Sequence, residues 1–241
     1  MPLAPTDVDA LADAADLEFS SPAEIVAWAD DRFGDELVVT ASFENAVLAH
    51  LVATAAPRAQ LVLLDTQYLF AETRWYAERV ARRLHLDLTV IRPRPDVVPD
   101  DRWQYDVDGC CAVRKVEPLN RALAGKRAWM SGLRRDDGPS RAGTPFVSWD
   151  AERGLVKVNP LAAMTHEDID RYHVENDLPR NPLTERGYPS IGCWPCTRPV
   201  AAGEDRRSGR WAGTGKTECG LHAPPSAPVS VTVGAQLRSA S

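Results

Sequence analysis

Short apolar runs alternate with helical patterns along the first half of the sequence, and this alternation most constrains the fold. Four runs, at residues 37–41, 60–65, 86–91 and 128–131, have the length of buried strands. Helical patterns lie between them, at about residues 44–56, 71–84 and 113–123. Strands that alternate with helices form a parallel sheet covered on both faces. We therefore predict a doubly wound, mostly parallel α/β fold that binds ligands at the carboxyl ends of its strands.

The rest of the chain divides into parts of different character. Ser21-Pro22-Ala23-Glu24 is a capping box that starts a helix, and Thr165 and Asp168 start another. Residues 92–108 are rich in Pro and Asp and predict a loop, and from residue 181 onward recurring Pro and Gly predict irregular backbone. We expect a helical segment at residues 1–35, an α/β domain at 36–200, an irregular C-terminal segment at 201–222 and a disordered tail at 223–241.

Charge and composition exclude several classes of partner. The 241 residues carry a formal net charge of -6, which argues against broad binding to nucleic acid or to an anionic membrane. An anionic substrate would need a local basic pocket. The sequence has no apolar run of membrane-spanning length and no pattern of a signal peptide at its start, so we expect a cytoplasmic protein. A homo-oligomer is compatible with the sequence.

Four of the five cysteines form two close pairs. Cys193 and Cys196 have the spacing at which both sulfurs reach one metal centre or close a redox disulfide. Cys110 and Cys111 are adjacent, so joint ligation demands irregular backbone or a multi-iron cluster with separate corners. Two alternatives stay open. In one, Cys110 and Cys111 are buried apolar residues, and Cys193 and Cys196 form half of a structural zinc site. In the other, Cys193 and Cys196 form a thioredoxin-like motif, although this pair lies late in the chain.

The fifth cysteine, Cys219, stands apart in polar surroundings near the end of the chain. Lys216 and His222 are close in sequence and favour the thiolate form, which is the nucleophile. A lone surface thiol is the alternative. Cys219 is our candidate nucleophile.

Many ordered motifs together resemble one family, the thioredoxin-dependent adenylyl-sulfate and phosphoadenylyl-sulfate reductases. The similarity extends from about residue 37 to residue 222. Its carriers are Leu64-Asp65-Thr66, Cys110-Cys111-x-x-Arg114-Lys115, Gly132-Leu133-Arg134-Arg135-Asp136, Val158-Asn159-Pro160-Leu161, Gly187-Tyr188-Pro189-Ser190-Ile191-Gly192-Cys193 with Cys196-Thr197, Gly209-Arg210-Trp211 and Glu218-Cys219-Gly220-Leu221-His222.

This resemblance implies a reaction and a cofactor. It implies reduction of adenylyl sulfate to sulfite and AMP in sulfate assimilation and cysteine biosynthesis, with thioredoxin as electron donor and an S-sulfocysteine on Cys219. The four paired cysteines mark the branch with a [4Fe-4S] cluster, ligated by Cys110, Cys111, Cys193 and Cys196. The cluster's expected role is structural and electrostatic, because thioredoxin supplies both electrons. The 3'-phosphorylated nucleotide is the alternative substrate.

The family's fold resembles that of ATP pyrophosphatases, the adenine nucleotide alpha hydrolase-like fold, with one departure here. Residues 40–45 contain no glycine where that fold carries a glycine-rich pyrophosphate loop. The departure is consistent with a substrate that lacks a β,γ-pyrophosphate. It also disfavours an ATP-dependent sulfur-transfer or tRNA-thiolation enzyme. A zinc-stabilised nucleotide-binding module, in which Cys219 has no role, is the third class.

Candidate substrate-binding residues fall into three sets. By resemblance, Lys115, Arg207 and Arg210 neutralise the phosphosulfate. Arg134, Arg135 and Arg141 form a second basic set after the strand that ends at residue 131, where a nucleotide phosphate would lie, although any one of these arginines could be a solvated surface residue. Four residues at strand ends are expected to line the adenosine site: Ser42, Leu64, Thr66 and Gly132. His222 either tunes Cys219 or caps the segment that contains it.

Overall fold

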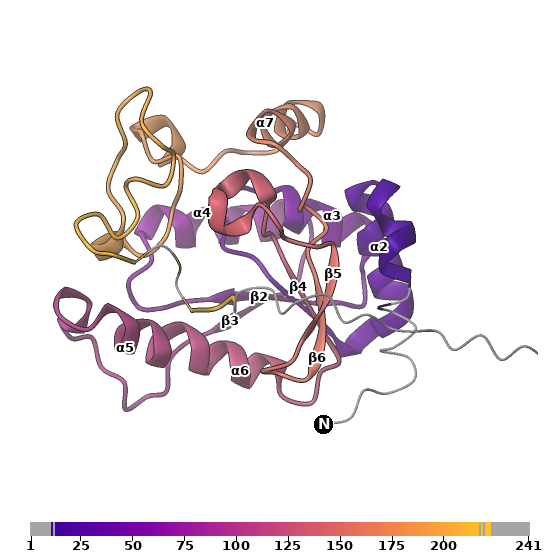
Figure 1. Ribbon diagram of the computed structural model, residues 1–241, viewed down its shortest axis with the longest axis horizontal. Helices are drawn as coiled ribbons and strands as arrows, with labels where there is room; N and C mark the ends of the chain where they lie inside the picture. The colour runs from indigo at the N-terminus through magenta and orange to yellow at the C-terminus, as the bar shows by residue number, and fades with distance from the viewer. Residues whose placement is uncertain (1–10, 12, 217, 219, 223–241) are drawn as a thin grey trace, which may run out of the picture.

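A six-stranded sheet forms the centre of the molecule (Figure 1), in a computed structural model that describes residues 11, 13–216, 218 and 220–222. The strands lie in the order β3-β2-β1-β4-β6-β5, and all are parallel except β5, which runs antiparallel to β6. This confirms the mostly parallel α/β fold. The strands are β1 (Leu37–Thr40), β2 (Gln60–Leu64), β3 (Leu88–Ile91), β4 (Ala128–Ser131), β5 (Val147–Asp150) and β6 (Leu155–Val158).

Helices cover both faces of this sheet. Figure 1 shows α2, α3, α4 and α7 on one side and α5 and α6 on the other. The alternation of side chains along β1 matches this division, because Val39 packs in the large core with α2 and α3 while Val38 packs with Leu119 of α6. The helices are α2 (Pro22–Phe33), α3 (Val47–Ala55), α4 (Ala71–Arg83), α5 (Val107–Cys111), α6 (Glu117–Leu123) and α7 (His166–Glu175).

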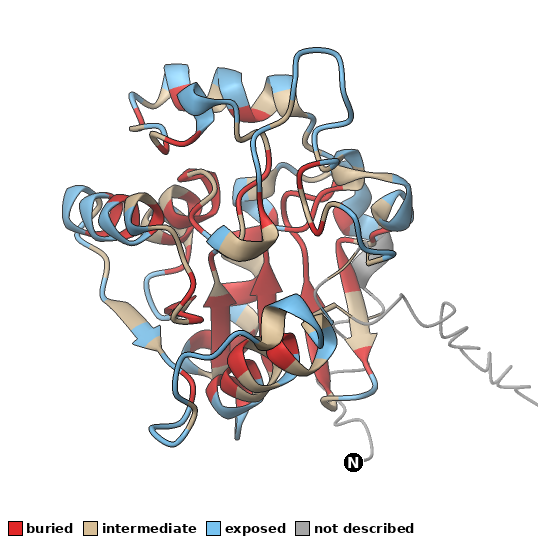
Figure 2. Cartoon of the chain, turned by 90° about the vertical axis from the view of Figure 1, so that its left-hand side faces the viewer, coloured by how far each residue is buried: buried red, intermediate tan, exposed pale blue. Residues whose placement is uncertain are grey.

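Burial follows the same layers. In Figure 2 the central strands are buried along most of their length, the edge strand β3 has no buried residue, and the helices are exposed on their outer faces. The predicted capping box at the start of α2 is present, because the Glu24 N–H donates to Ser21 Oγ at 3.3 Å and the Ser21 N–H donates to the Glu24 carboxylate at 2.7 Å. No helix in the described part of the chain is long and apolar enough to cross a membrane.

The sheet has a topological switch point between β1 and β4. From β1 the chain first adds β2 and β3 on one side, then crosses to β4 on the other. Thr40 at the end of β1 is in register with Ser131 at the end of β4. The loops that follow these two strands therefore begin side by side, and such a position forms a crevice for ligands in open α/β sheets.

Several element boundaries differ from the sequence prediction. The β5–β6 hairpin was not predicted, because a charged side chain, Lys157, interrupts the apolar run of β6 and is buried only by the fold. The third helix begins at Val47 and not at Glu44, because residues 42–46 form the turn after β1. A helix, α5, begins inside the predicted loop at 92–108. The predicted tail at 223–241 lies outside the described residues.

The chain after α5 winds as a π-helix over Ala112–Val116 before α6 begins. A π turn contains one residue more than an α turn and is common at functional sites. It follows directly on the adjacent pair Cys110 and Cys111, for which the sequence demanded irregular backbone. The two cysteines end one helix, and the π turn sets the orientation of everything that follows.

Candidate active site

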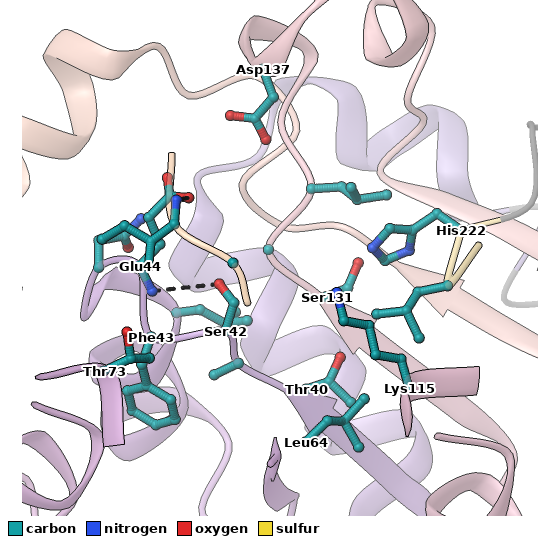
Figure 3. A pocket seen from close by; sticks show the side chains of 18 of the residues that line it. Thr40, Ser42, Phe43, Glu44, Leu64, Thr73, Lys115, Ser131, Asp137 and His222 are labelled. Carbon is teal, nitrogen blue, oxygen red and sulfur yellow. Dashed lines mark hydrogen bonds between the residues drawn. The ribbon is translucent and has the colours of Figure 1, made fainter. Parts of the chain in front are cut away.

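A cavity of about 200 Å³ lies at the carboxyl ends of β1, β2 and β4, and we call it the strand-end cavity. Figure 3 shows Thr40, Ser42, Leu64 and Ser131 around it, with Lys115 and His222 close by. All four residues predicted at strand ends line it, and so do five cationic side chains. The strand-end residues are Ser42, Leu64, Thr66 and Gly132, and the cationic residues are Lys115, Arg134, Arg141, Arg207 and Arg210.

The turn after β1 forms one side of the strand-end cavity without a glycine. Phe43 has a positive φ of 54° and a buried side chain, and its carbonyl accepts a hydrogen bond from Asn181 Nδ2 at 3.0 Å. The Glu44 carboxylate accepts the Ile191 N–H at 3.0 Å, while the Glu44 N–H donates to Ser42 Oγ at 3.5 Å (Figure 3). Residues distant in sequence therefore hold a conformation that glycine usually supplies.

Four charged side chains of the cavity belong to one chain of ion pairs, and Glu218 joins two of them. Arg134 contacts Asp137 at 2.6 Å, and Asp137 contacts Arg141 at 2.9 Å. Arg141 then donates from Nε and Nη2 to the two carboxylate oxygens of Glu218, at 2.7 and 2.8 Å, and Arg207 Nη2 lies 3.6 Å from Glu218. Burial would raise the pKa of Glu218, but the Arg141 hydrogen bonds lower it overall, so Glu218 is a carboxylate at neutral pH.

The guanidinium of Arg210 lies between a glycine and an aromatic ring. It is 4.6 Å from the ring centre of Trp211 and donates from Nη1 to Ser190 Oγ at 3.2 Å. A Cβ on Gly192 would lie 2.4 Å from Arg210 Nη2, so a larger residue there would displace this guanidinium from its present position. Arg210 Nε is buried and has no hydrogen-bond partner among the described residues, which leaves one donor for a ligand.

The structure places Arg135 away from the strand-end cavity, unlike its neighbour Arg134. Its Nε donates to the Thr144 carbonyl at 2.8 Å, its Nη1 contacts Glu18 at 3.1 Å, and its guanidinium packs over Phe146. Arg134 has extended backbone, in which successive side chains point to opposite sides. Of the predicted second basic set, only Arg134 and Arg141 line the cavity.

All four paired cysteines line a second, smaller cavity, which we call the cysteine cavity. Cys110, Cys111 and Cys193 are buried, and Cys196 is partly buried. The Cys196 N–H donates to the Cys193 carbonyl at 3.0 Å, which closes the turn between this pair. No three His, Cys, Asp or Glu side chains are arranged to hold a single metal ion in the part of the chain that the structure describes. The four cysteines therefore share one cavity, but among the described residues they are not arranged as a preformed coordination sphere for a single metal ion.

The surroundings of the cysteine cavity favour the protonated form of two of its thiols, those of Cys110 and Cys196. Burial, followed by the neighbouring Cys193, raises the pKa of Cys196 to about 11. Burial also raises the pKa of Cys110. A bound metal centre would reverse this balance, because coordination deprotonates a thiol.

The two cavities share one wall. Thr66, Lys115 and Cys193 line both of them. Thr66 Oγ lies 3.2 Å from Cys193 Sγ, and the charge of Lys115 acts to lower the pKa of Cys196. Lys115 therefore lies between the cysteine cavity and the strand-end cavity, four residues beyond Cys111 on the π turn.

The last described residues cover the strand-end cavity. The His222 ring stacks on Trp129, with ring centres 5.3 Å apart, and its Nδ1 lies 3.0 Å from Lys157 Nζ. Burial, and then the charge of Lys157, hold the pKa of His222 well below its usual range. The ring is therefore neutral, and its Nδ1 accepts a hydrogen bond from the Lys157 ammonium. Leu221 packs in a cluster with Cys111 and Trp211. The predicted nucleophile, Cys219, lies outside the described residues.

Sequence reasoning missed both carboxylates of the ion-pair chain and the aromatic platform under His222. The spacing of Asp137 and Arg141, four residues apart, is a signal that could have paired them. Lys157, a lone cation in an apolar strand, could have marked the platform that Trp129 forms. Glu218 gave no such signal, because its partners Arg207 and Arg141 lie 11 and 77 residues away in sequence.

Comparison with known proteins defines the class of this chain. A family model described as the phosphoadenosine phosphosulfate reductase domain matches residues 36–199, and the chain belongs to this family. The family resemblance found in the sequence is thus confirmed. A crystal structure of phosphoadenylyl-sulfate reductase from Candida auris superposes with a TM-score of 0.70 at 26% identity, covering 82% of this chain and 99% of that one.

Two relatives with different printed names are equally similar. The adenosine 5'-phosphosulfate reductase of Streptomyces coelicolor is 47% identical, over 90% of this chain and 95% of the relative. The phosphoadenosine 5'-phosphosulfate reductase of Gloeobacter violaceus is also 47% identical, over 84% of this chain and 89% of the relative. Overall identity therefore defines the family and does not separate the two substrates.

Proposed function

We propose that this chain reduces adenylyl sulfate to sulfite and AMP, with thioredoxin as the electron donor. The observation that carries the proposal is the wall shared by a basic cavity at the strand ends and a cavity lined by four cysteines. The first suits an adenine nucleotide that bears adjacent anionic groups. The family and the Streptomyces coelicolor relative support the same activity. We further propose that the protein works in the cytoplasm, where thiols are kept reduced.

The proposed reaction has two steps, both at Cys219. The Cys219 thiolate attacks the sulfur of adenylyl sulfate, an S–S bond forms, and the S–O bond to the phosphate breaks and releases AMP. A thioredoxin thiolate then attacks Cys219 Sγ, sulfite leaves, and the second thioredoxin thiol resolves the mixed disulfide. Thioredoxin is oxidised to its disulfide, and the sulfur gains two electrons. Glu218 and His222, which bracket Cys219 in sequence, contact cavity residues, and this supports the assignment.

Substrate charge is neutralised by residues already aimed at the strand-end cavity. Arg210 keeps one buried donor without a partner among the described residues, and Lys115 reaches the cavity from the cysteine side. A fixed cation in a partly buried site stabilises charge that develops on the leaving phosphate. We assign Lys115, Arg207 and Arg210 to the phosphosulfate, and Ser42, Leu64, Thr66 and Gly132 to the adenosine.

The cysteine cavity fits a [4Fe-4S] cluster, and we propose that Cys110, Cys111, Cys193 and Cys196 would hold it. Four soft sulfur donors around one buried cavity are the ligand set of such clusters. Adjacent cysteines suit a cluster with separate iron corners better than a single zinc ion. When bound, the cluster supplies a fixed charge beside the substrate and ties the cysteine segments together. Lys115 is the residue of this chain that connects it to the strand-end cavity.

The test of the proposed function is a single turnover without thioredoxin. Anaerobic enzyme mixed with adenylyl sulfate should release about one AMP per active site and add about 80 Da, one SO3 group, to the peptide that contains Cys219. The Cys219→Ser variant should show neither the AMP burst nor the adduct, yet should bind AMP and retain iron. Sulfite release at the normal rate by that variant would exclude the mechanism.

Phosphoadenylyl sulfate is the second candidate substrate, because the relative from Gloeobacter violaceus bears that name at equal identity. Comparing kcat/KM for the two nucleotides, with and without the 3'-phosphate, decides between them. We expect adenylyl sulfate to be preferred, and a preference for the 3'-phosphorylated nucleotide would reverse the assignment.

A further inference from the structure

Glu218 contacts two basic side chains of the strand-end cavity, and no role assigned so far explains these contacts. Its two carboxylate oxygens accept hydrogen bonds from Arg141 Nε and Nη2, at 2.7 and 2.8 Å, and Oε1 also accepts from Ser140 Oγ at 3.2 Å. Arg207 Nη2 lies 3.6 Å away. The Glu218 side chain is only 22% exposed and that of Arg141 only 15%. A bidentate pair this poorly solvated is geometrically specific and stronger than an exposed ion pair.

These contacts attach the C-terminal segment to the anion-binding side chains directly. Glu218 immediately precedes Cys219 in the sequence, while Arg141 and Arg207 both line the strand-end cavity. Glu218 itself is not among the residues that line the cavity. Its carboxylate therefore holds the two arginines without filling the space that a ligand would take.

The same carboxylate weakens the positive potential that an anionic ligand would meet. In the chain formed by Arg134, Asp137, Arg141, Glu218 and Arg207, three positive charges face two negative charges. Removal of the Glu218 charge would raise the excess from one positive charge to two. Anion affinity would then rise although the segment has lost its attachment.

We propose that Glu218 is a positioning residue, a carboxylate clamp that docks the Cys219 segment on Arg141 and Arg207 and thereby lowers the site's affinity for anionic ligands. The proposal rests on the proposed function for the part that concerns Cys219. Its signature is an opposite change in two quantities. Loss of the clamp strengthens the binding of phosphate-bearing ligands and slows the chemical step, whereas a merely structural residue would weaken both.

The first experiment measures binding by calorimetry with AMP and with adenosine, which lacks the anion. In Glu218→Gln, the Kd of AMP should fall about three- to tenfold, while the Kd of adenosine stays within about twofold of wild type. Glu218→Asp keeps the charge and should bind AMP within about twofold of wild type. Glu78→Gln removes a carboxylate from an exposed position on α4 and serves as the matched control, with no change in either Kd.

The second experiment measures steady-state sulfite release from adenylyl sulfate with the same four proteins. Glu218→Gln should lower KM and lower kcat by about tenfold or more, and Glu218→Asp should recover part of kcat. Unchanged or weaker AMP binding, an equal shift for adenosine, or an unchanged kcat would each overturn the clamp. If wild type itself releases no sulfite, the proposed function fails, and the AMP and adenosine affinities still decide whether Glu218 tunes anion binding.

Discussion

The cysteine wall (Cys110, Cys111, Cys193 and Cys196) and the arginine wall (Arg134, Arg141, Arg207 and Arg210) face adjoining cavities but are built differently. The arginine wall is half neutralised from within, because Asp137 and Glu218 form ion pairs with three of its four members. The cysteine wall is buried among aromatic side chains such as Tyr68, and burial raises the pKa values of two of its thiols.

The difference shows what each wall requires from outside the chain. Ion pairs within the chain already balance part of the charge of the arginine wall, so this wall does not depend on substrate for its stability. Buried thiols with raised pKa values gain most from a resident metal centre that converts them to thiolates. The proposed cluster would therefore be a permanent part of the fold, and the substrate a transient one.

The largest expected effect comes from the cysteine wall. Cys193→Ser should remove most of the iron and lower the free energy of unfolding by at least about 3 kcal/mol, because ligation energy is coupled to folding. Iron analysis and thermal unfolding of anaerobic protein measure both. Cys219→Ser is the matched control and should retain its iron. A Cys193→Ser protein with full iron content and normal activity would show that the two walls do not differ in this way.

Replacing the residue that belongs to both cavities should have the next largest effect. Lys115→Ala should lower kcat/KM for adenylyl sulfate, with a loss of about 2–4 kcal/mol of transition-state stabilisation. The reason is that the substitution leaves partly buried substrate charge without a partner. Iron content should stay at the wild-type level. Lys126→Ala is the control, because Lys126 lines neither cavity and its ammonium donates to the Asp35 carbonyl. An unchanged kcat/KM in Lys115→Ala would assign that lysine to the cysteine wall alone.

A pair of arginine variants sharpens the description of the arginine wall. Arg210→Ala should cost about 2 kcal/mol or more of transition-state stabilisation, measured through kcat/KM, since Arg210 lines the strand-end cavity and its buried Nε has no hydrogen-bond partner among the described residues. Arg135→Ala removes an arginine that lies outside the strand-end cavity and should leave kcat/KM within about threefold of wild type. Equal losses in the two variants would mean that position relative to the cavity does not decide an arginine's role.

The smallest effect concerns the turn after β1, which lines the strand-end cavity. His173 Nε2 accepts the Ala46 N–H at 3.3 Å, and burial lowers the pKa of His173 below its ordinary value of 6.5. The stabilisation from a neutral His173 is therefore present above the unfolded-state pKa and is lost as the pH falls toward the folded-state pKa. The Tm should fall between pH 7 and pH 5, and less steeply in His173→Gln. Equal slopes in the two proteins would exclude this contribution.

Local patterns predicted the elements that build the cavities, and distant contacts explain what they missed. The strands at residues 37–40, 60–64 and 128–131 were readable because buried parallel strands are short apolar runs. The side of the backbone on which Arg134 and Arg135 lie was not readable, since it depends on the extended conformation after β4. Glu218 was recognised as part of a motif and given no role, because its partner Arg141 is brought to it only by the fold.

The π turn at Ala112–Val116 gives this stretch a tolerance of length changes that its composition does not reveal. One residue fewer would restore ordinary α-helical winding, because five π-helical residues turn the chain by nearly the same angle as four α-helical ones. Leu119 of α6 is fixed in the core beneath the sheet, and Cys110 and Cys111 would keep nearly the same orientation relative to it. A second deletion would shorten a regular α-helix and rotate the two cysteines by about 100° relative to Leu119. Among homologous chains, we therefore expect the stretch between Cys111 and Leu119 to vary in length by one residue and no more.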